Sequence, residues 1–213
     1  MTDISYYESR FNFDKRRNYT WKYIAKDLQK FIDKDSVVLD LGAGYCDFIN
    51  NVTAKEKWAL DIFPDLTKYA SSNVKTCIDS VLNPLVNMPD NYFNIIFASN
   101  FFEHFSFQDI DIVMKFIKKK LQADGVLILI QPNYRYAYRE YFDDYTHKTV
   151  FTDISIQDYL ESNSFKVIKN IPRYIPFSMK SKLSIGYKLI KLYLLLPIRP
   201  FAKQMLVVAR KGK

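Results

Sequence analysis

Short, continuous apolar runs recur along the chain from residue 37 onward, separated by segments with helical or loop patterning. Continuous runs, rather than alternating ones, are typical of strands buried on both faces of a parallel sheet. They predict five strands: Val37–Leu41, Lys57–Asp61, Val74–Ile78, Phe93–Ser99 and Val126–Gln131. Such strands in alternation with helices predict an α/β fold in which helices cover both faces of the sheet.

Helical spacing of apolar residues marks two segments beside these runs. Residues Tyr7 to Ile32 carry such spacing and predict a helix before the first strand. Ile110–Leu121 has its apolar residues on one face and predicts an amphipathic helix. Asp124-Gly125 predicts a turn between that helix and the fifth strand.

The pattern changes after the fifth strand. Ile154–Leu160 predicts a helix, whereas Phe165–Ile171 and Met205–Ala209 predict two further strands. Because no simple helical crossover joins these two strands, we expect them to form an antiparallel hairpin at the edge of the sheet.

The length of 213 residues and the hydrophobic content of 48% fit one globular domain with a sizeable core. We expect this domain to span residues 1–213, with an N-terminal helical cap (1–33) and an apolar, basic insertion (172–201) before the last strand. Cys46 and Cys77 form no disulfide or metal-ligand pattern, which favours a reducing compartment. The start lacks a signal-peptide pattern, and no apolar stretch approaches the roughly 20 residues of a spanning helix, so we expect a cytoplasmic protein.

The formal net charge of +8 is unevenly distributed. From Ser162 to Lys213 there are twelve Lys and Arg and no Asp or Glu, whereas the preceding chain has nineteen basic and twenty-three acidic residues. This asymmetry suggests an anionic partner, such as a phosphorylated substrate, a membrane surface or a nucleic acid. A solvated basic face is the open alternative.

The first predicted strand leads into Leu39-Asp40-Leu41-Gly42-Ala43-Gly44, where the glycines allow a tight turn and close approach of a ligand. Asp40 would repel a pyrophosphate but would suit a cationic ligand with an amino group and a sulfonium. Asp47 replaces the third glycine of a dinucleotide fingerprint. Asp61 ends the next strand, where an acid commonly binds ribose hydroxyls. Taken alone, an acid at the position of Asp40 is more often a helix N-cap or a turn acid than a ligand-binding residue, so the prediction of a cationic ligand depends on the combination with Gly42, Gly44 and Asp61.

Four segments in this order resemble class I S-adenosylmethionine-dependent methyltransferases, over roughly residues 36 to 132. They are Val37–Gly44, Ala59–Asp61, Ile95–His104 and Leu121–Ile128. The resemblance implies S-adenosylmethionine as cofactor, with S-adenosylhomocysteine as product. It also implies a Rossmann-like seven-stranded sheet of order 3-2-1-4-5-7-6, with strand 7 antiparallel.

The resemblance also implies roles for individual residues. Asp40 and the glycine turn would hold the methionine end of the cofactor, Asp61 the ribose and Asp79 the adenine amino group. The full set expected to contact the cofactor is Asp40, Gly42, Ala43, Gly44, Asp61, Ile62, Asp79, Ser80, Asn100 and Phe101. The chain departs from the family at Cys46, where a third glycine is common, and this leaves the path of the loop open.

The methyl acceptor is indicated by weaker features. His147, with Asp143 or Asp144 to assist it, is the candidate general base for an oxygen acceptor, although a surface-loop histidine is an equal alternative. The segment Tyr141–His147, with the downstream Phe151-Thr152 and Asp158-Tyr159-Leu160, resembles methyltransferases of bacterial surface-polysaccharide biosynthesis. This resemblance implies O-methylation of a sugar, a glycan precursor or a related anionic small molecule. For His104, which follows Glu103, we expect a structural or cleft-lining role.

The sequence lacks the motifs that are typical of methyltransferases with other acceptors. Amino methylation of adenine or cytosine usually uses a Pro-Pro clamp after the fourth strand, where this chain has Ser99-Asn100-Phe101-Phe102. A metal-assisted catechol-type enzyme would have an acid in place of Ser99, so we expect no metal.

Lysines alternate with apolar residues from Ser181 to Leu196 and predict a basic amphipathic helix. Four roles remain open: packing on the sheet edge, a lid, a homodimer contact, or contact with the anionic inner surface of a membrane. The alternative to an enzyme is a non-catalytic binding module, or a nucleic-acid-binding protein that uses the basic C-terminal region. No nucleic-acid-binding motif is visible, so a specific nucleic acid is not expected.

Overall fold

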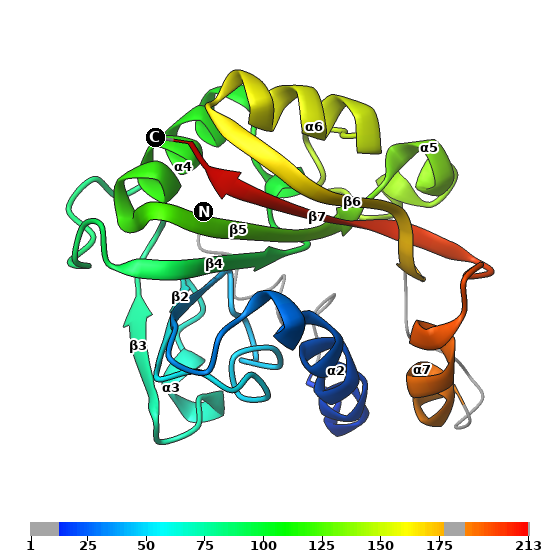
Figure 1. Cartoon of the computed structure of the whole chain (residues 1–213), viewed down its shortest axis with the longest axis horizontal. Coiled ribbons are helices and arrows are strands. Elements are labelled where there is room, and N and C mark those ends of the chain that lie inside the picture. Colours follow the sequence, from blue (N-terminus) through cyan, green and yellow to red (C-terminus); the bar gives the residue numbers. More distant parts are fainter. Residues whose placement is uncertain (1–12, 177–185, 213) are drawn as a thin grey trace.

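The computed structural model describes residues 13–176 and 186–212. Its strands form one seven-stranded sheet of order β3-β2-β1-β4-β5-β7-β6 (Figure 1). β1 to β5 are parallel, and β7 runs antiparallel to both β5 and β6. The strands are β1 (Val37–Leu41), β2 (Glu56–Asp61), β3 (Val74–Ile78), β4 (Phe93–Ser99), β5 (Leu121–Pro132), β6 (Phe165–Pro176) and β7 (Ala202–Lys211). The predicted fold and strand order are confirmed.

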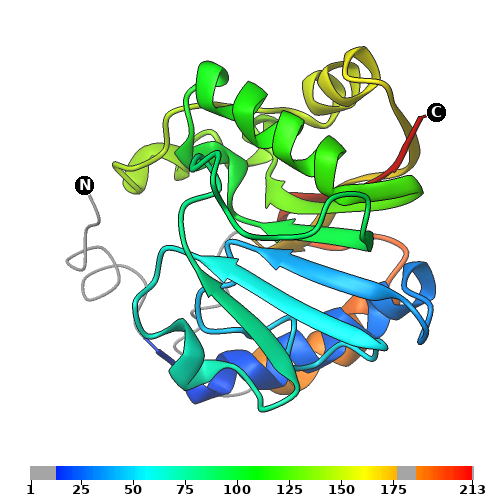
Figure 2. The same ribbon diagram turned by 90° about the vertical axis from the view of Figure 1, so that its left-hand side faces the viewer.

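Helices cover both faces of this sheet. The α-helices are α2 (Lys15–Leu28), α3 (Leu66–Tyr69), α4 (Phe107–Lys120), α5 (Tyr134–Ala137), α6 (Asp153–Ser162) and α7 (Gly186–Leu195). Short 3-10 turns are η1 (Gln29–Phe31), η2 (Phe102–His104) and η3 (Tyr141–Asp143). In Figures 1 and 2, α4 and α6 lie on one side of the sheet, and α2 and α7 lie side by side on the other.

Successive residues of one strand supply the cores on opposite faces. Leu39 and Leu41 of β1 pack with α4 and α6, whereas Val38 between them packs with α2 and α7. Since both faces of β1 are buried, all of its residues except Asp40 are apolar, which is why the run in the sequence is nearly continuous. β1, β3 and β4 begin and end at the predicted residues.

Side-chain caps fix where the main helices begin. Asp14 accepts a hydrogen bond from the Arg16 N–H at the start of α2, and Ser106 accepts one from the Asp109 N–H at the start of α4. Such caps satisfy backbone donors that have no partner within the helix. The helix predicted from Tyr7 begins at Lys15, directly after its cap Asp14, and residues 1–12 lie outside the described part.

Helix α7 packs beside α2 through Ile190 and Leu194, which are both buried. Its other face is exposed at Leu189, Leu192 and Leu195. The helix predicted from Ser181 begins at Gly186, and residues 177–185 lie outside the described part. β6 continues to Pro176, so part of the segment predicted as an insertion is strand. Among the described helices, none has the length and apolar character needed to cross a membrane.

A partly buried hydrogen bond joins α2 to β6. The Tyr174 hydroxyl of β6 donates to Oδ2 of Asp27 in α2 at 2.9 Å, and Tyr174 is fully buried. Burial and the Asp27 charge raise the pKa of Tyr174 well above its usual value, so the hydroxyl remains a donor.

We expect Tyr174→Phe to lower the free energy of unfolding by about 1.5 kcal/mol, because a hydrogen bond to a charged group is lost. Urea denaturation measures the change. Tyr19→Phe, at an exposed tyrosine of α2, is the matched control and should change stability by less than about 0.5 kcal/mol. Equal stability of the two variants would contradict a stabilising role for this bond.

Candidate active site

The glycine turn follows β1 directly, at the carboxyl edge of the parallel strands. Gly42 and Gly44 have φ values of 75° and 51°, a left-handed conformation that favours glycine. The Gly42 N–H donates to the Leu60 carbonyl of β2 at 2.9 Å. β1 lies between β2 and β4, where the strand order reverses, and open α/β sheets bind ligands at this point.

Asp61, the last residue of β2, holds this turn in place. Its Oδ2 accepts the Gly44 N–H at 2.7 Å, and its Oδ1 accepts the Phe63 N–H at 2.9 Å. Asp61 is buried, yet each carboxylate oxygen has a second lone pair. The carboxylate therefore organises the loop and retains capacity for a ligand hydroxyl, so its predicted ribose role stays a prediction.

Asp40 lies within the sheet, in β1, just before the glycine turn. It is 2% exposed, and its Oδ2 has no hydrogen-bond partner among the described residues. Burial, with a smaller contribution from the Asp61 charge, raises the pKa of Asp40 well above its usual range. A buried carboxylate without a partner is costly unless a cation or donor compensates it. The residues present therefore fit a cofactor with an ammonium group.

Phe101 lies against the glycine turn from the other side. A Cβ built on Gly42 would lie 2.4 Å from Cδ2 of Phe101, so the ring occupies the space that any side chain at position 42 would need. Asn100 has a φ of 48° and donates its N–H to the Ile130 carbonyl at 2.8 Å. This turn after β4 brings Phe101 onto Gly42, and the two residues predicted to share the cleft are in contact.

The loop beyond the glycines keeps its path without a third glycine. Cys46 has a φ of 58°, the left-handed conformation that a glycine would adopt there, and its side chain is buried. This conformation costs a residue with a side chain about 1 kcal/mol. Asp47, in place of the fingerprint glycine, forms an ion pair with Arg17 of α2 at 2.8 Å. The carboxylate at position 47 thus ties α2 to the loop.

The predicted adenine residues follow β3 at the same edge. The Asp79 N–H donates to the Asp61 carbonyl at 3.0 Å. The two acids therefore lie next to each other at the carboxyl ends of the neighbouring strands β2 and β3. The Asp79 carboxylate accepts the Asn83 side-chain amide at 3.0 Å and the Ser80 N–H at 2.7 Å. Ile62 is 43% exposed beside Asp61. The structure brings the predicted cofactor residues of β1, β2 and β3 together.

On the acceptor side, His147 lies in a loop that folds back onto η2. The N–H groups of Lys148 and Thr149 both donate to the Glu103 carbonyl, at 2.7 and 3.3 Å. Nδ1 of His147 lies 2.6 Å from the Tyr141 carbonyl oxygen, and the rings of His147 and His104 have centroids 5.0 Å apart. The only two histidines of the sequence therefore meet.

The acids predicted to assist His147 lie in different surroundings. Oδ1 of Asp144 accepts the Thr146 hydroxyl at 2.6 Å, and the same hydroxyl oxygen lies 2.9 Å from Nδ1 of His104. Asp144 therefore reaches His104 through Thr146. Asp143 ends η3 and is exposed.

Glu103 completes this cluster and was not predicted as part of it. It is 2% exposed, and neither carboxylate oxygen has a hydrogen-bond partner among the described residues. Burial raises the pKa of Glu103 to about 8, although the nearby N–H groups of Glu103 and Phe101 oppose this rise. Burial also lowers the pKa of His104 to about 4 and, to a lesser extent, that of His147. One feature of the sequence could have indicated this cluster. Glu103 and His104 are adjacent just after β4, in a chain that has one other histidine.

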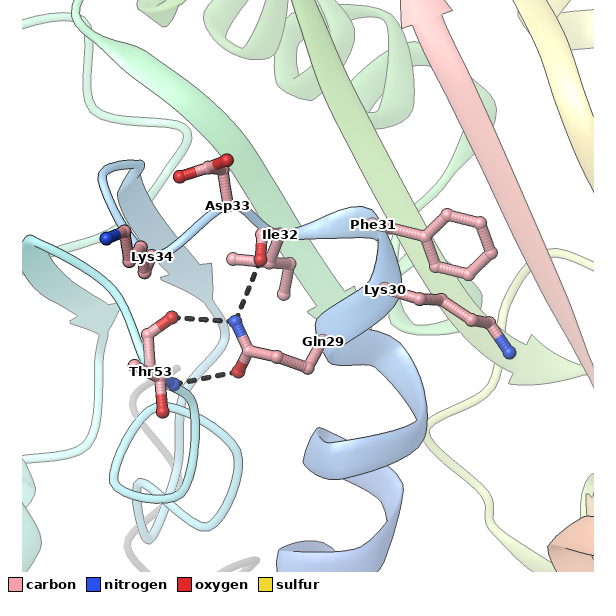
Figure 3. Close-up of a pocket in the computed structure, with 7 residues that line it drawn as sticks. All are labelled: Gln29, Lys30, Phe31, Ile32, Asp33, Lys34 and Thr53. Carbon is pink, nitrogen blue, oxygen red and sulfur yellow. Dashed lines mark hydrogen bonds between the residues drawn. The ribbon is translucent and has the colours of Figure 1, made fainter.

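A hollow of about 590 Å³ lies elsewhere, at the amino ends of β1 and β2 (Figure 3). It is lined by residues Gln29 to Lys34 and Thr53. The side-chain NH₂ of Gln29 donates to the carbonyls of Thr53 and Ile32, both at 2.8 Å. The side-chain oxygen of Gln29 accepts the Thr53 N–H at 2.9 Å. These groups are satisfied by the protein itself, and the hollow is at the opposite end of β1 from the glycine turn.

Comparison with solved structures identifies the same architecture in several organisms. An S-adenosylmethionine-dependent methyltransferase from Archaeoglobus fulgidus is 17% identical, with 90% of this chain and 94% of that chain covered and a TM-score of 0.61. One from Clostridium acetobutylicum is 14% identical, with 98% and 97% covered and a TM-score of 0.62. One from Mesorhizobium loti is 11% identical, with 87% and 96% covered and a TM-score of 0.61. At these identities the likeness shows the fold.

Membership of a family rests on sequence. No curated protein matches the chain. The family model of the methyltransferase domain matches residues 13–170, most of the chain and all of the strands β1 to β5. S-adenosylmethionine is the cofactor that this match implies, in agreement with the prediction from the sequence. The chain belongs to the methyltransferase domain family.

Proposed function

We propose that this protein is an S-adenosylmethionine-dependent methyltransferase that methylates a hydroxyl group. The observation that carries the cofactor assignment is the buried Asp40 carboxylate, whose Oδ2 lacks a partner in the described part of the chain. It lies beside a turn that only glycine can form beneath Phe101. A cationic ligand would compensate the carboxylate, whereas a pyrophosphate would be repelled by it.

The residues of the chain have separate tasks in this proposal. Asp40 and the turn Gly42-Ala43-Gly44 bind the amino-acid end of the cofactor, Asp61 its ribose and Asp79 with Ser80 its adenine. Bound S-adenosylmethionine supplies an electrophilic methyl group. Phe101, seated on Gly42, excludes water from the space between cofactor and acceptor.

The acceptor hydroxyl must lose its proton as its oxygen forms the new bond to carbon. We assign this proton to the cluster of His147 and His104, with Asp144 held beside them. The Tyr141 carbonyl accepts from Nδ1 of His147, so the lone pair that takes a proton lies on Nε2. The resemblance of residues 141–147 to surface-polysaccharide methyltransferases supports a sugar or glycan precursor as acceptor. The basic C-terminal region suits an anionic one.

The role of Asp40 predicts that Asp40→Asn weakens S-adenosylmethionine binding roughly tenfold or more, about 1.4 kcal/mol. Calorimetric titration measures the affinity. Asp65→Asn is the matched control, because Asp65 is an exposed acid that pairs with Lys68 beyond the site. If both variants bind the cofactor like the wild type, Asp40 has no part in binding.

Cofactor binding should also release a proton. The pKa of Asp40 is raised in the free protein and should fall when a cation binds, so affinity should rise with pH until Asp40 is ionised without ligand. Titrations in buffers of different ionisation enthalpy report the released proton. Asp40→Asn should abolish the release, and an unchanged release in that variant would assign the proton to another group.

The acceptor side is tested by His147→Ala. We expect methyl transfer to fall by about 10²–10⁴-fold, because the acceptor proton loses its route, while cofactor affinity is retained. Radiolabelled methyl transfer to a panel of sugar phosphates and nucleotide sugars provides the assay. Tyr145→Phe, at an exposed neighbour in the same loop, should keep wild-type turnover. Near-normal transfer by His147→Ala would remove His147 from the reaction.

A further inference from the structure

The cluster of Glu103, His104 and His147 has the composition of a metal site. One potential ligand atom from each residue lies within 4.8 Å of the other two. Ligands held about 2.0–2.2 Å from a zinc-like ion lie roughly 3–4 Å apart, so small side-chain rotations would close the set. Glu103 and His104 are fixed by η2, and His147 is brought to them by the loop anchored on the Glu103 carbonyl.

The hydrogen bonds of the two histidines are those that metal ligands usually make. A carbonyl oxygen can only accept, so the 2.6 Å contact with Tyr141 places the proton of His147 on Nδ1. The Thr146 hydroxyl donates to Asp144, so its oxygen accepts the proton on Nδ1 of His104. The ring of His147 therefore carries a lone pair on Nε2. Metal-bound histidines commonly donate their other nitrogen to a carbonyl or a carboxylate in this way.

The buried carboxylate of Glu103 is an independent observation. With 2% exposure and no hydrogen-bond partner for either oxygen within the described ranges, it is not explained by the protein alone. Desolvating an acid in this way is costly unless it is paired or coordinates a metal. A divalent cation between Glu103 and the two imidazoles would compensate it.

We propose that Glu103, His104 and His147 bind a divalent first-row transition-metal ion. Two imidazoles and one carboxylate are a donor set for Zn²⁺, Fe²⁺ or Mn²⁺, whereas Mg²⁺ and Ca²⁺ prefer oxygen ligands alone. Three protein ligands leave at least one coordination position open, as in catalytic rather than structural sites. This departs from the expectation of no metal, which considered only the residue at the end of β4, Ser99.

Metal binding would stand without the proposed methyl transfer, but its role toward the acceptor rests on that function. An acceptor hydroxyl at the open position would have a lowered pKa, so its O–H bond breaks with the proton passing to solvent water. The resulting oxygen is then the nucleophile. In the metal-bound protein His147 is a ligand, and its action as a direct base is confined to the metal-free protein.

The test is a titration of the chelator-treated, full-length protein without a histidine tag, using Zn²⁺ by calorimetry and Co²⁺ by visible absorption. We expect one ion per chain and the ligand-field bands of Co²⁺ bound by nitrogen and oxygen. Because the chain has two histidines, imidazole coordination can come only from this cluster. Absence of saturable binding by the wild type would overturn the proposal.

Substitutions test which residues bind the metal. His147→Ala and Glu103→Gln should abolish stoichiometric binding, and Thr146→Val, which removes the partner of His104, should weaken it about 10–100-fold. Asp158→Asn is the matched control, an exposed acid of α6 that should bind like the wild type. Circular dichroism reports folding, and His147, only partly buried, keeps the test valid if Glu103→Gln does not fold. Wild-type affinity in His147→Ala would contradict the assignment.

The two proposals fail separately. Asp40→Asn should lose cofactor affinity and keep the metal, whereas His147→Ala should lose the metal and keep cofactor affinity. If the wild type binds S-adenosylmethionine but no metal, only the metal site is refuted. If it binds the metal but no S-adenosylmethionine, only the methyltransferase proposal is refuted.

Discussion

The two hydrogen bonds accepted by the Asp61 carboxylate hold the cofactor side of this molecule together. They fix the backbone of Gly44 and Phe63, which belong to turns after two different strands. Both turns are buried, so a side chain without two acceptors would leave backbone donors unpaired at a cost of about 1–3 kcal/mol each. The Asp61 side chain therefore fixes the glycine turn together with the Leu60 carbonyl, which accepts the Gly42 N–H.

The two sides of the site are built differently. On the cofactor side the backbone provides most of the geometry, through left-handed glycines and N–H groups at strand ends. In the histidine cluster, side chains provide it, since His147, Thr146 and Asp144 form a chain of contacts to η2. A backbone scaffold tolerates changes in most side chains, whereas a scaffold of side chains changes with each substitution.

The strands were predictable because burial on both faces leaves a clear pattern in sequence. β1 and β4 are buried at most positions, so their sequences are mainly apolar, and both strands begin and end at the predicted residues. β6 was predicted too short because its last residues include Pro172 and Pro176, which interrupt a strand pattern yet are tolerated at the edge of a sheet. The turns expected to contact the cofactor follow these strands directly, so their place at the carboxyl edge of the sheet was predictable for the same reason.

The histidine cluster could not be predicted in this way. The contact of His147 with His104 depends on backbone hydrogen bonds from Lys148 and Thr149 to a carbonyl more than forty residues earlier. No periodicity in the sequence reports such a bond. The short elements α5 and η3 precede the loop that carries His147. They have too few residues to show a helical pattern in the sequence. Chemistry placed by loops is thus the part of a fold that sequence patterns describe least.

The position of β7 between β5 and β6 has a consequence for how the chain folds. β7 comes last among the strands, yet it lies between β5 and β6 and hydrogen-bonds to both. During synthesis, β5 and β6 must therefore wait with unpaired edges until residues 202–211 have left the ribosome. Open edges of apolar strands are prone to pair with other chains. The nascent protein is accordingly vulnerable to aggregation until residues 202–211 have emerged and paired with both strands.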